Sequence, residues 1–292
     1  MSADISAYAK VARRRAAVAA AGRILVFVVL IGFSVMFLTP LYLMLSMAFK
    51  SSSELATTSA WAWPQKFTLE NFNTVLTAPA MNFVLFGRNT LIIAVTNTVG
   101  VVLTSAMVAY AFARLRFRGR DRLFIIVLAT MMLPGIVTMV PTYVLYAKLH
   151  WINTFLPLTV PGFLGGGAFN IFMLRQFFMS VPRELDEAAV LDGAGHWTVF
   201  SRIMLPLSTA ALATVGVFTF SGAFRDFMGP LLYLNDPDMK TLEVGLQTYA
   251  GLRGERWDLL MAGSVITTVP LILLFFFGQK YFVKGLTLTG GK

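Results

Sequence analysis

Few side chains in this sequence have the types and spacing that chemistry requires. Only 13% of the 292 residues are charged, and the two histidines, His150 and His196, are isolated from one another. There is no cysteine, so the sequence offers neither a disulfide framework nor a thiolate metal site. We therefore predict no metal ion and no other cofactor.

Arg225 and Asp226 are the exception, because they are adjacent within a long apolar stretch. Neighbouring residues on one α-helix point about 100° apart, so these two do not pair neatly with each other. Charge inside a bilayer is costly and usually marks a pathway for a polar solute. We predict that one or both face a translocation cavity or a partner subunit. The alternatives are an ion pair with another helix and a helix that ends early.

Asn170 is a second candidate for contact with a solute. It follows Pro161 and the glycine run 165–167, which predict an interrupted helix. An interrupted helix is tolerated at membrane depth only where protein or water covers its backbone, so we expect this segment to face inward. Gly162 and Gly166 also have the GxxxG spacing, and close helix packing is the alternative explanation for these residues.

The composition requires a membrane environment, since 57% of the residues are hydrophobic and the mean hydropathy is +0.72. A membrane-spanning helix needs about 20 apolar residues. Six runs qualify, at 24–49, 89–113, 123–147, 151–174, 203–224 and 259–279, and the apolar segment 227–234 extends the fifth run past Arg225 and Asp226. The first is too long for a signal-peptide core of roughly 7–15 residues and is interpreted as a retained helix. Pro40, Pro134 and Pro141 predict kinks in the first and third runs.

Basic residues set the predicted orientation. Sixteen of the 24 lysines and arginines lie in the N-terminal segment, the second and fourth connections and the C-terminal end. Seven lie on the other side, and Arg225 lies within a span. The positive-inside rule then predicts six spans with both termini cytoplasmic, and it accounts for the net charge of +10 without nucleic acid. We predict a cytoplasmic basic tail at 1–23, a six-helix membrane domain at 24–285 and a cytoplasmic tail at 286–292.

Two predicted outer segments are long enough to have structure of their own. Residues 50–88 contain Trp61 and Trp63 and a short capped helix predicted at 68–72. Residues 235–258 carry mixed charge and Trp257. Such segments could meet an external partner, although their aromatic residues are more often interface anchors.

The cytoplasmic connection at 181–206 predicts two short helices. Pro182 suits the first helical position, and the acidic residues that follow it suit a helix N-terminus. An apolar face and a glycine stop are predicted from Leu185, Ala188, Ala189, Leu191, Gly193 and Gly195. The second helix would carry Trp197, Phe200 and Ile203 on one side, before Pro206 begins span five.

A water-facing helix with small residues can be approached closely by another protein, which suits docking. The spacing of Ala and Gly also loosely suits a helix-turn-helix reader of DNA. The position between two membrane spans argues against DNA, and an inert connecting loop is the remaining alternative.

The same connection resembles the EAA loop of ABC-importer permeases. The resemblance rests on Glu187-Ala-Ala189, Asp192-Gly-Ala194, Phe200, and Ile203 with Leu205-Pro206. The segments 109–119 and 279–287 resemble their counterparts in carbohydrate permeases of the MalG-like, binding-protein-dependent family. The resemblance covers nearly the whole chain. Two positions depart from it: Ala210 stands where relatives often have proline, and Phe224-Arg-Asp226 stands where many have Trp-Asn-Asp.

The resemblance implies an all-α, type I ABC importer (MetI-like) architecture. It implies an assembly of two permeases as a heterodimer, two ATPase subunits and an extracytoplasmic solute-binding protein, carrying a sugar or a related polyol or glycerol phosphate. It also implies contact with the ATPase through Glu187, Ala188, Ala189, Asp192 and Gly193, with 290–292 as a weaker candidate.

Two other functions are alternatives to this one. A self-sufficient secondary carrier usually needs ion-coupling residues in its spans, and Asp226 is the only acidic candidate. A membrane-embedded enzyme would need paired carboxylates, a histidine cluster or a nucleophile with a base, and the spans contain none of these. No P-loop occurs, so ATP hydrolysis is expected in a separate subunit.

Overall fold

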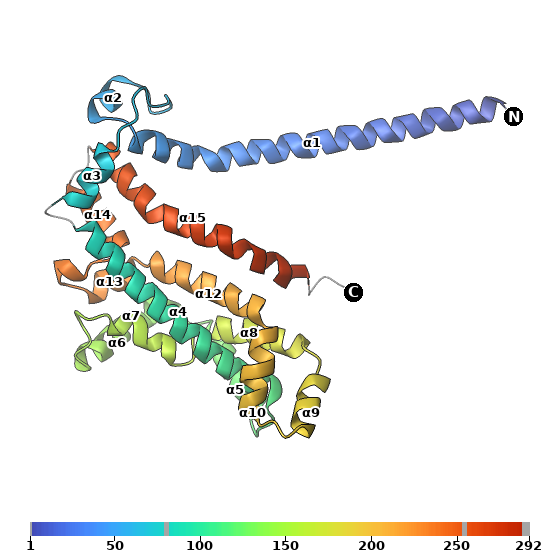
Figure 1. The fold of residues 1–292 in the computed structure, drawn as a ribbon, viewed down its shortest axis with the longest axis vertical. Helices are drawn as coiled ribbons and strands as arrows, with labels where there is room; N and C mark the ends of the chain where they lie inside the picture. Colours follow the sequence, from blue (N-terminus) through green and yellow to red (C-terminus); the bar gives the residue numbers. More distant parts are fainter. Residues whose placement is uncertain (1, 79–81, 253–255, 288–292) are drawn as a thin grey trace. The chain divides into compact units, whose positions relative to one another are not determined.

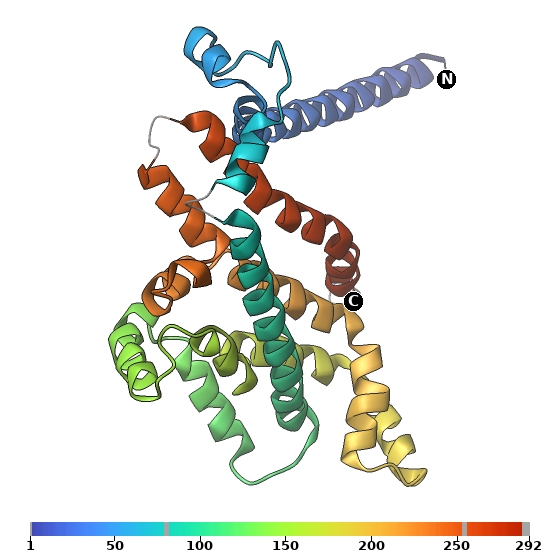
Figure 2. The same ribbon diagram turned by 60° about the vertical axis from the view of Figure 1, so that its left-hand side comes forward.

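The structure, a computed structural model, describes residues 2–78, 82–252 and 256–287, and within these ranges it is helical without a strand (Figures 1 and 2). The predicted all-α class is confirmed. The chain divides into two compact units. One contains residues up to 72 together with 256–265, and the other contains 73–255 together with the residues from 266 onward.

The first unit begins with α1 (Ser2–Ala48), whose stretch Ala19–Ala48 is long and apolar enough to cross a membrane. Its side chains from Ile24 to Leu38 are mostly exposed, as expected of a helix that faces lipid. The helix continues through Pro40, where a kink was predicted.

Polar contacts order the segment after α1. Lys50 is fully buried and donates from Nζ to the carbonyl of Ser59 at 2.9 Å. The hydroxyl of Thr68 accepts from the N–H of Glu70 at 3.1 Å, at the start of α3 (Glu70–Thr77). The short helix predicted at 68–72 is therefore present, but it begins at Glu70 and continues to Thr77. A second one, α2 (Ser52–Thr57), was not predicted.

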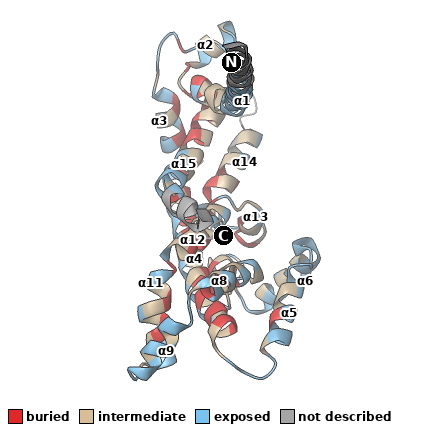
Figure 3. Cartoon of the chain, turned by 90° about the vertical axis from the view of Figure 1, so that its right-hand side faces the viewer, coloured by how far each residue is buried: buried red, intermediate tan, exposed pale blue. Residues whose placement is uncertain are grey.

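The second unit is built around α4 (Phe83–Arg114), which packs along α8 (Ala168–Ser180) and α12 (Thr209–Phe224). Figure 3 shows buried residues concentrated on α4 and α8. Their apolar side chains form one core with Val199, Phe200 and Met204. Shorter elements also contact α4: α7 (Leu156–Thr159), η1 (Val160–Phe163), α14 (Leu242–Leu252) and η3 (Pro237–Met239).

Two glycines allow η1 and the turn after it to lie directly on α4. Thr104 donates its hydroxyl to the carbonyl of Gly162 at 2.9 Å. A Cβ added to Gly162 would lie 2.5 Å from Oδ1 of Asn97, and one added to Gly166 would overlap Ser105. The GxxxG spacing thus corresponds to close packing of the interrupted fourth span against the second.

Within the described ranges, four helical segments are long and apolar enough to cross a membrane: Ala19–Ala48, Phe83–Arg114, Leu156–Ser180 and Trp257–Gln279. The last of these belongs to α15 (Trp257–Thr287). Two bent pairs bring the number to six if each pair is one span. These pairs coincide with the third and fifth predicted runs.

The bends differ from a straight-span interpretation of the sequence. The third span consists of α5 (Arg120–Thr130) and α6 (Gly135–Lys148), bent by 96°. Pro134, where a kink was predicted, is the residue directly before α6. Pro141 lies inside α6 without ending it. In the fifth span the chain bends by 78° after Leu207. Pro206 therefore does not begin this span; it lies inside α11 (Leu205–Leu207), and α12 begins after Ser208.

Candidate functional site: the exposed connection between the fourth and fifth spans

The first helix of this connection is α9 (Glu184–Leu191). It begins two residues beyond Pro182, so the proline precedes the helix instead of occupying its first position. The first turn contains Glu184, Asp186 and Glu187, whose negative charge interacts favourably with the positive end of the helix dipole. The sequence therefore predicted the helix correctly but started it too early.

Gly193 ends α9 through two backbone hydrogen bonds. Its φ is +85°, a left-handed conformation that glycine adopts without a steric cost. The N–H of Gly193 donates to Val190 at 3.0 Å, and the N–H of Ala194 donates to Ala189 at 2.9 Å. This is the Schellman arrangement, which satisfies the last carbonyls of a helix. Gly195 has a φ of −77° and is not needed for the stop, contrary to the prediction.

The second helical segment runs through α10 (His196–Thr198), η2 (Val199–Met204) and α11. Phe200 is buried against Tyr110 of α4, with ring centroids 5.1 Å apart. Trp197 contacts Phe200 at 5.4 Å but remains 65% exposed. The two aromatic residues predicted on one side of the second helix therefore differ in their surroundings: Phe200 lies in the core and Trp197 lies at the surface.

The predicted coupling residues form an accessible surface on α9 and the turn that follows it. Glu187, Ala188, Asp192 and Gly193 are exposed, whereas Ala189 is half-buried against the core. Leu191 is 88% exposed although it is apolar. A hollow of about 450 Å³ lies beside this surface, lined by Tyr110, Arg114, Asp186, Glu187, Val190, Leu191, His196 and Val199. Exposed apolar side chains next to a hollow are typical of a protein-docking surface.

Arg114, at the end of α4, fixes this surface to the membrane domain and was not identified from the sequence. Its Nη1 lies 3.3 Å from Oδ2 of Asp186 in α9, and its side chain is only 4% exposed. Its Nη2 donates to the carbonyls of Phe178 and Val181 at 2.7 and 2.6 Å. One guanidinium thus joins the end of α8, the turn after it and α9. The signal that could have identified Arg114 in the sequence was its position in the segment 109–119, which resembles its counterpart in carbohydrate permeases.

The candidate pathway residues lie elsewhere in this unit. Arg225 and Asp226 follow α12 directly, before α13 (Met228–Tyr233), and Arg225 is exposed. Oδ1 of Asp226 accepts from the N–H of Gly229 at 3.1 Å, so its side chain caps the next helix. Helix α12 therefore ends at Phe224, which is one of the alternatives raised above.

Asn170 lies on α8, and its amide donates to the carbonyl of Gly166 at 2.8 Å.

Glu243 of α14 was not identified from the sequence as a candidate site residue. Burial raises the pKa of its carboxyl, and the positive charge of Arg225 acts in the opposite direction. Residues 290–292, the weaker candidate for ATPase contact, lie outside the described residues.

Residues 98–288 match the family described as "Binding-protein-dependent transport system inner membrane component". The arabinooligosaccharides transport system permease protein AraQ of Halalkalibacterium halodurans is 37% identical over 78% of this chain and 81% of its own length. The trehalose/maltose transport system permease protein MalG of Thermococcus litoralis is 38% identical over 76% of this chain and 80% of its own length.

A solved bacterial ABC transporter that imports the acidic polysaccharide alginate contains a chain with the same fold. The TM-score is 0.79 at 24% identity, covering 88% of this chain and 95% of the other.

The chain belongs to the family of inner-membrane permease components of binding-protein-dependent transport systems. The resemblance found in the sequence, to permeases of the carbohydrate ABC-importer type, is confirmed. The fold is accordingly that of a transport subunit of an ABC importer.

Proposed function

We propose that this subunit forms half of the translocation pathway for a sugar or a related polyol or glycerol phosphate, and that ATP hydrolysis in partner subunits drives it through α9. The single observation that carries the coupling role is the surface of α9, which is exposed and partly apolar yet held to α4 by Arg114. A displacement of α9 by a docked partner would therefore reach the core of the membrane domain.

The proposed assembly contains a second permease, two ATPase subunits and an extracytoplasmic solute-binding protein. The names of the relatives support a carbohydrate as the solute, since they transport arabinooligosaccharides and trehalose or maltose. A solved alginate transporter with this fold was captured with a periplasmic protein holding an alginate pentasaccharide, with a TM-score of 0.63 at 19% identity.

Within this subunit, Glu187, Ala188, Ala189, Asp192 and Gly193 are proposed to contact the ATPase, and Arg225, Asp226 and Asn170 to border the pathway. The charge asymmetry supports an orientation with both termini in the cytoplasm. In this orientation residues 1–23 and 286–292 are cytoplasmic tails of the membrane domain at 24–285, and the connection at 181–206 faces the ATPases.

The test is co-purification of the tagged chain from its native host. The wild type should bring an ATPase and a second permease. Glu187→Lys reverses an exposed charge on α9 and should lose the ATPase while retaining the second permease. Asp238→Lys is the matched control, because it reverses an exposed charge in the predicted outer segment and should retain both partners.

Two results would contradict the proposal. One is equal recovery of the ATPase with Glu187→Lys and with the control. The other is a wild-type chain that is recovered alone and transports solute in liposomes without ATP, which would favour the secondary carrier.

A further inference from the structure

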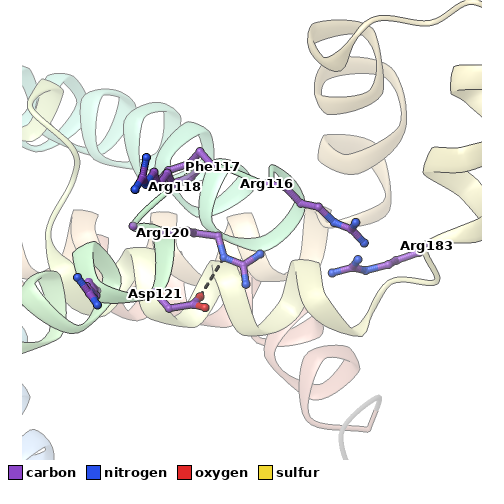
Figure 4. Close-up of a pocket in the computed structure, with 8 residues that line it drawn as sticks. Arg116, Phe117, Arg118, Arg120, Asp121 and Arg183 are labelled. Carbon is purple, nitrogen blue, oxygen red and sulfur yellow. Dashed lines mark hydrogen bonds and ion pairs between the residues drawn. The ribbon is translucent and has the colours of Figure 1, made fainter.

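A strongly basic hollow lies at the connection between α4 and α5, apart from the coupling surface. Its volume is about 810 Å³, and it is lined by Arg116, Phe117, Arg118, Gly119, Arg120, Asp121, Arg122 and Arg183. Arg183 reaches it from the turn before α9, so two segments distant in the sequence converge there (Figure 4).

Positive charge in this hollow is largely uncompensated. Asp121 is its only acidic residue, and it pairs with Arg120 at 2.9 Å. Among the described residues, no carboxylate forms an ion pair with Arg116, Arg118, Arg122 or Arg183. Figure 4 shows the guanidinium groups of Arg116 and Arg183 directed toward one another. Two cations so placed repel each other, and an anion between them removes the repulsion.

The arrangement suits a phosphate group in particular. Guanidinium groups bind phosphate oxygens through paired N–H donors, and two of them can hold one phosphate from both sides. The positive-inside rule explains an excess of basic residues in this connection. It does not require residues from two separate segments to meet around one hollow.

The position of the hollow indicates a lipid rather than a soluble anion. The arginines begin directly after Arg114, where the apolar helix α4 ends, and α5 leads back into an apolar segment from Arg120. Phe117 among them is 41% exposed and packs on Phe112, with ring centroids 6.0 Å apart. A phenylalanine ring beside basic residues at the end of a span is suited to the boundary between headgroups and acyl chains, because the ring is apolar and the guanidinium groups are charged.

The hollow is also held in place by the fold. Gly119, with a φ of +85°, makes the turn into α5. Arg114 anchors the other side, because it binds the carbonyl of Val181, two residues before Arg183.

We propose that this hollow binds the phosphate headgroup of an anionic phospholipid of the inner leaflet, held chiefly between Arg116 and Arg183. Because Arg183 immediately precedes α9, the bound lipid would lie beside the start of α9. The proposal rests on the proposed orientation, which places this connection on the cytoplasmic side, but not on the solute or on the identity of the ATPase.

The test uses the purified full chain in neutral detergent, with bound lipid counted by native mass spectrometry during titration with phosphatidylglycerol or phosphatidylcholine. Arg116→Gln with Arg183→Gln should weaken phosphatidylglycerol binding about fivefold for each arginine removed, and roughly twenty- to thirtyfold for the pair. The matched control is Arg88→Gln with Lys148→Gln, which removes two exposed charges at the ends of α4 and of the third span that are far from the hollow. This control should bind phosphatidylglycerol like the wild type. Phosphatidylcholine should bind weakly to all three proteins.

Three outcomes overturn the proposal. Equal loss of phosphatidylglycerol in both double variants would mean that only net charge matters. Competition by millimolar inorganic phosphate as effective as that by the lipid would mean a site for a soluble anion. If the double variant fails to fold, Arg183→Gln alone should still show the fivefold loss, and an unchanged affinity would equally reject the site.

Discussion

At the scale of single residues, Arg114 connects the membrane domain to the proposed docking helix. A buried ion pair adds little net stability, because its formation strips water from both charges. Removing one partner, in contrast, leaves the other charged in an apolar environment. Arg114 would leave behind not only Asp186 but also the carbonyls of Phe178 and Val181.

Arg114→Ala should therefore destabilise the protein by about 3–5 kcal/mol, the range typical of a broken buried pair. Asp186→Asn should cost less, because the two carbonyl contacts of Arg114 remain. Thermal unfolding in detergent measures both, with Arg202→Ala as the control, since Arg202 is an exposed arginine in the same connection. A loss for Arg114→Ala no larger than that of Arg202→Ala would show that the contacts carry no stability.

The sequence predicted the ends of α9 better than its attachment. Acidic residues at the start and Gly193 at the end are local signals, because each acts on backbone groups within a few residues. The pairing of Arg114 with Asp186 depends on how α4 and α9 come together, which no local pattern records. Its charge was accordingly counted with the other basic residues of the connection.

At the scale of elements, glycine residues allow the interrupted fourth span to pack closely on α4. Gly165, Gly166 and Gly167 all have positive φ, but they differ in their surroundings. A Cβ on Gly166 would overlap Ser105 of α4, whereas one on Gly165 would meet open space. Comparison of Gly165 with Gly166 therefore distinguishes a requirement for an unusual backbone conformation from a requirement for close packing against α4.

Gly166→Ala should destabilise the protein by about 1–3 kcal/mol more than Gly165→Ala, because both carry the backbone strain and only the first adds a steric overlap. Comparison of their unfolding temperatures tests this. Equal effects of the two substitutions would mean that backbone conformation alone requires the glycines, and the packing explanation would fail.

Hydrophobicity predicted where the spans lie but not where they bend. The uncharged runs agree with the observed helices because lipid contact demands apolar side chains over the whole length. The bend in the third span had a signal in Pro134. The bend after Leu207 lies two residues beyond Pro206, which was interpreted from the sequence only as the start of the fifth span.

At the scale of the whole molecule, the uneven distribution of basic residues determines the predicted orientation. The docking proposal and the lipid proposal both place their residues on the cytoplasmic side. Leu191 on α9 should therefore lie on the opposite side of the membrane from Lys66 in the segment after α1. Both residues are exposed, and the chain contains no cysteine, so a single introduced thiol reports one position.

Lys66→Cys should react with a membrane-impermeant maleimide in intact spheroplasts, whereas Leu191→Cys should react only after the membrane is permeabilised. The reagent is excluded by the bilayer, so labelling reports the side on which a thiol lies. The cysteine-free parent gives the background, and labelling of both variants after solubilisation shows that each thiol is accessible. Labelling of Leu191→Cys in intact spheroplasts would place α9 outside, where it could meet neither a cytoplasmic ATPase nor the inner-leaflet lipid. Both proposals would then fail together, whatever the family relationship.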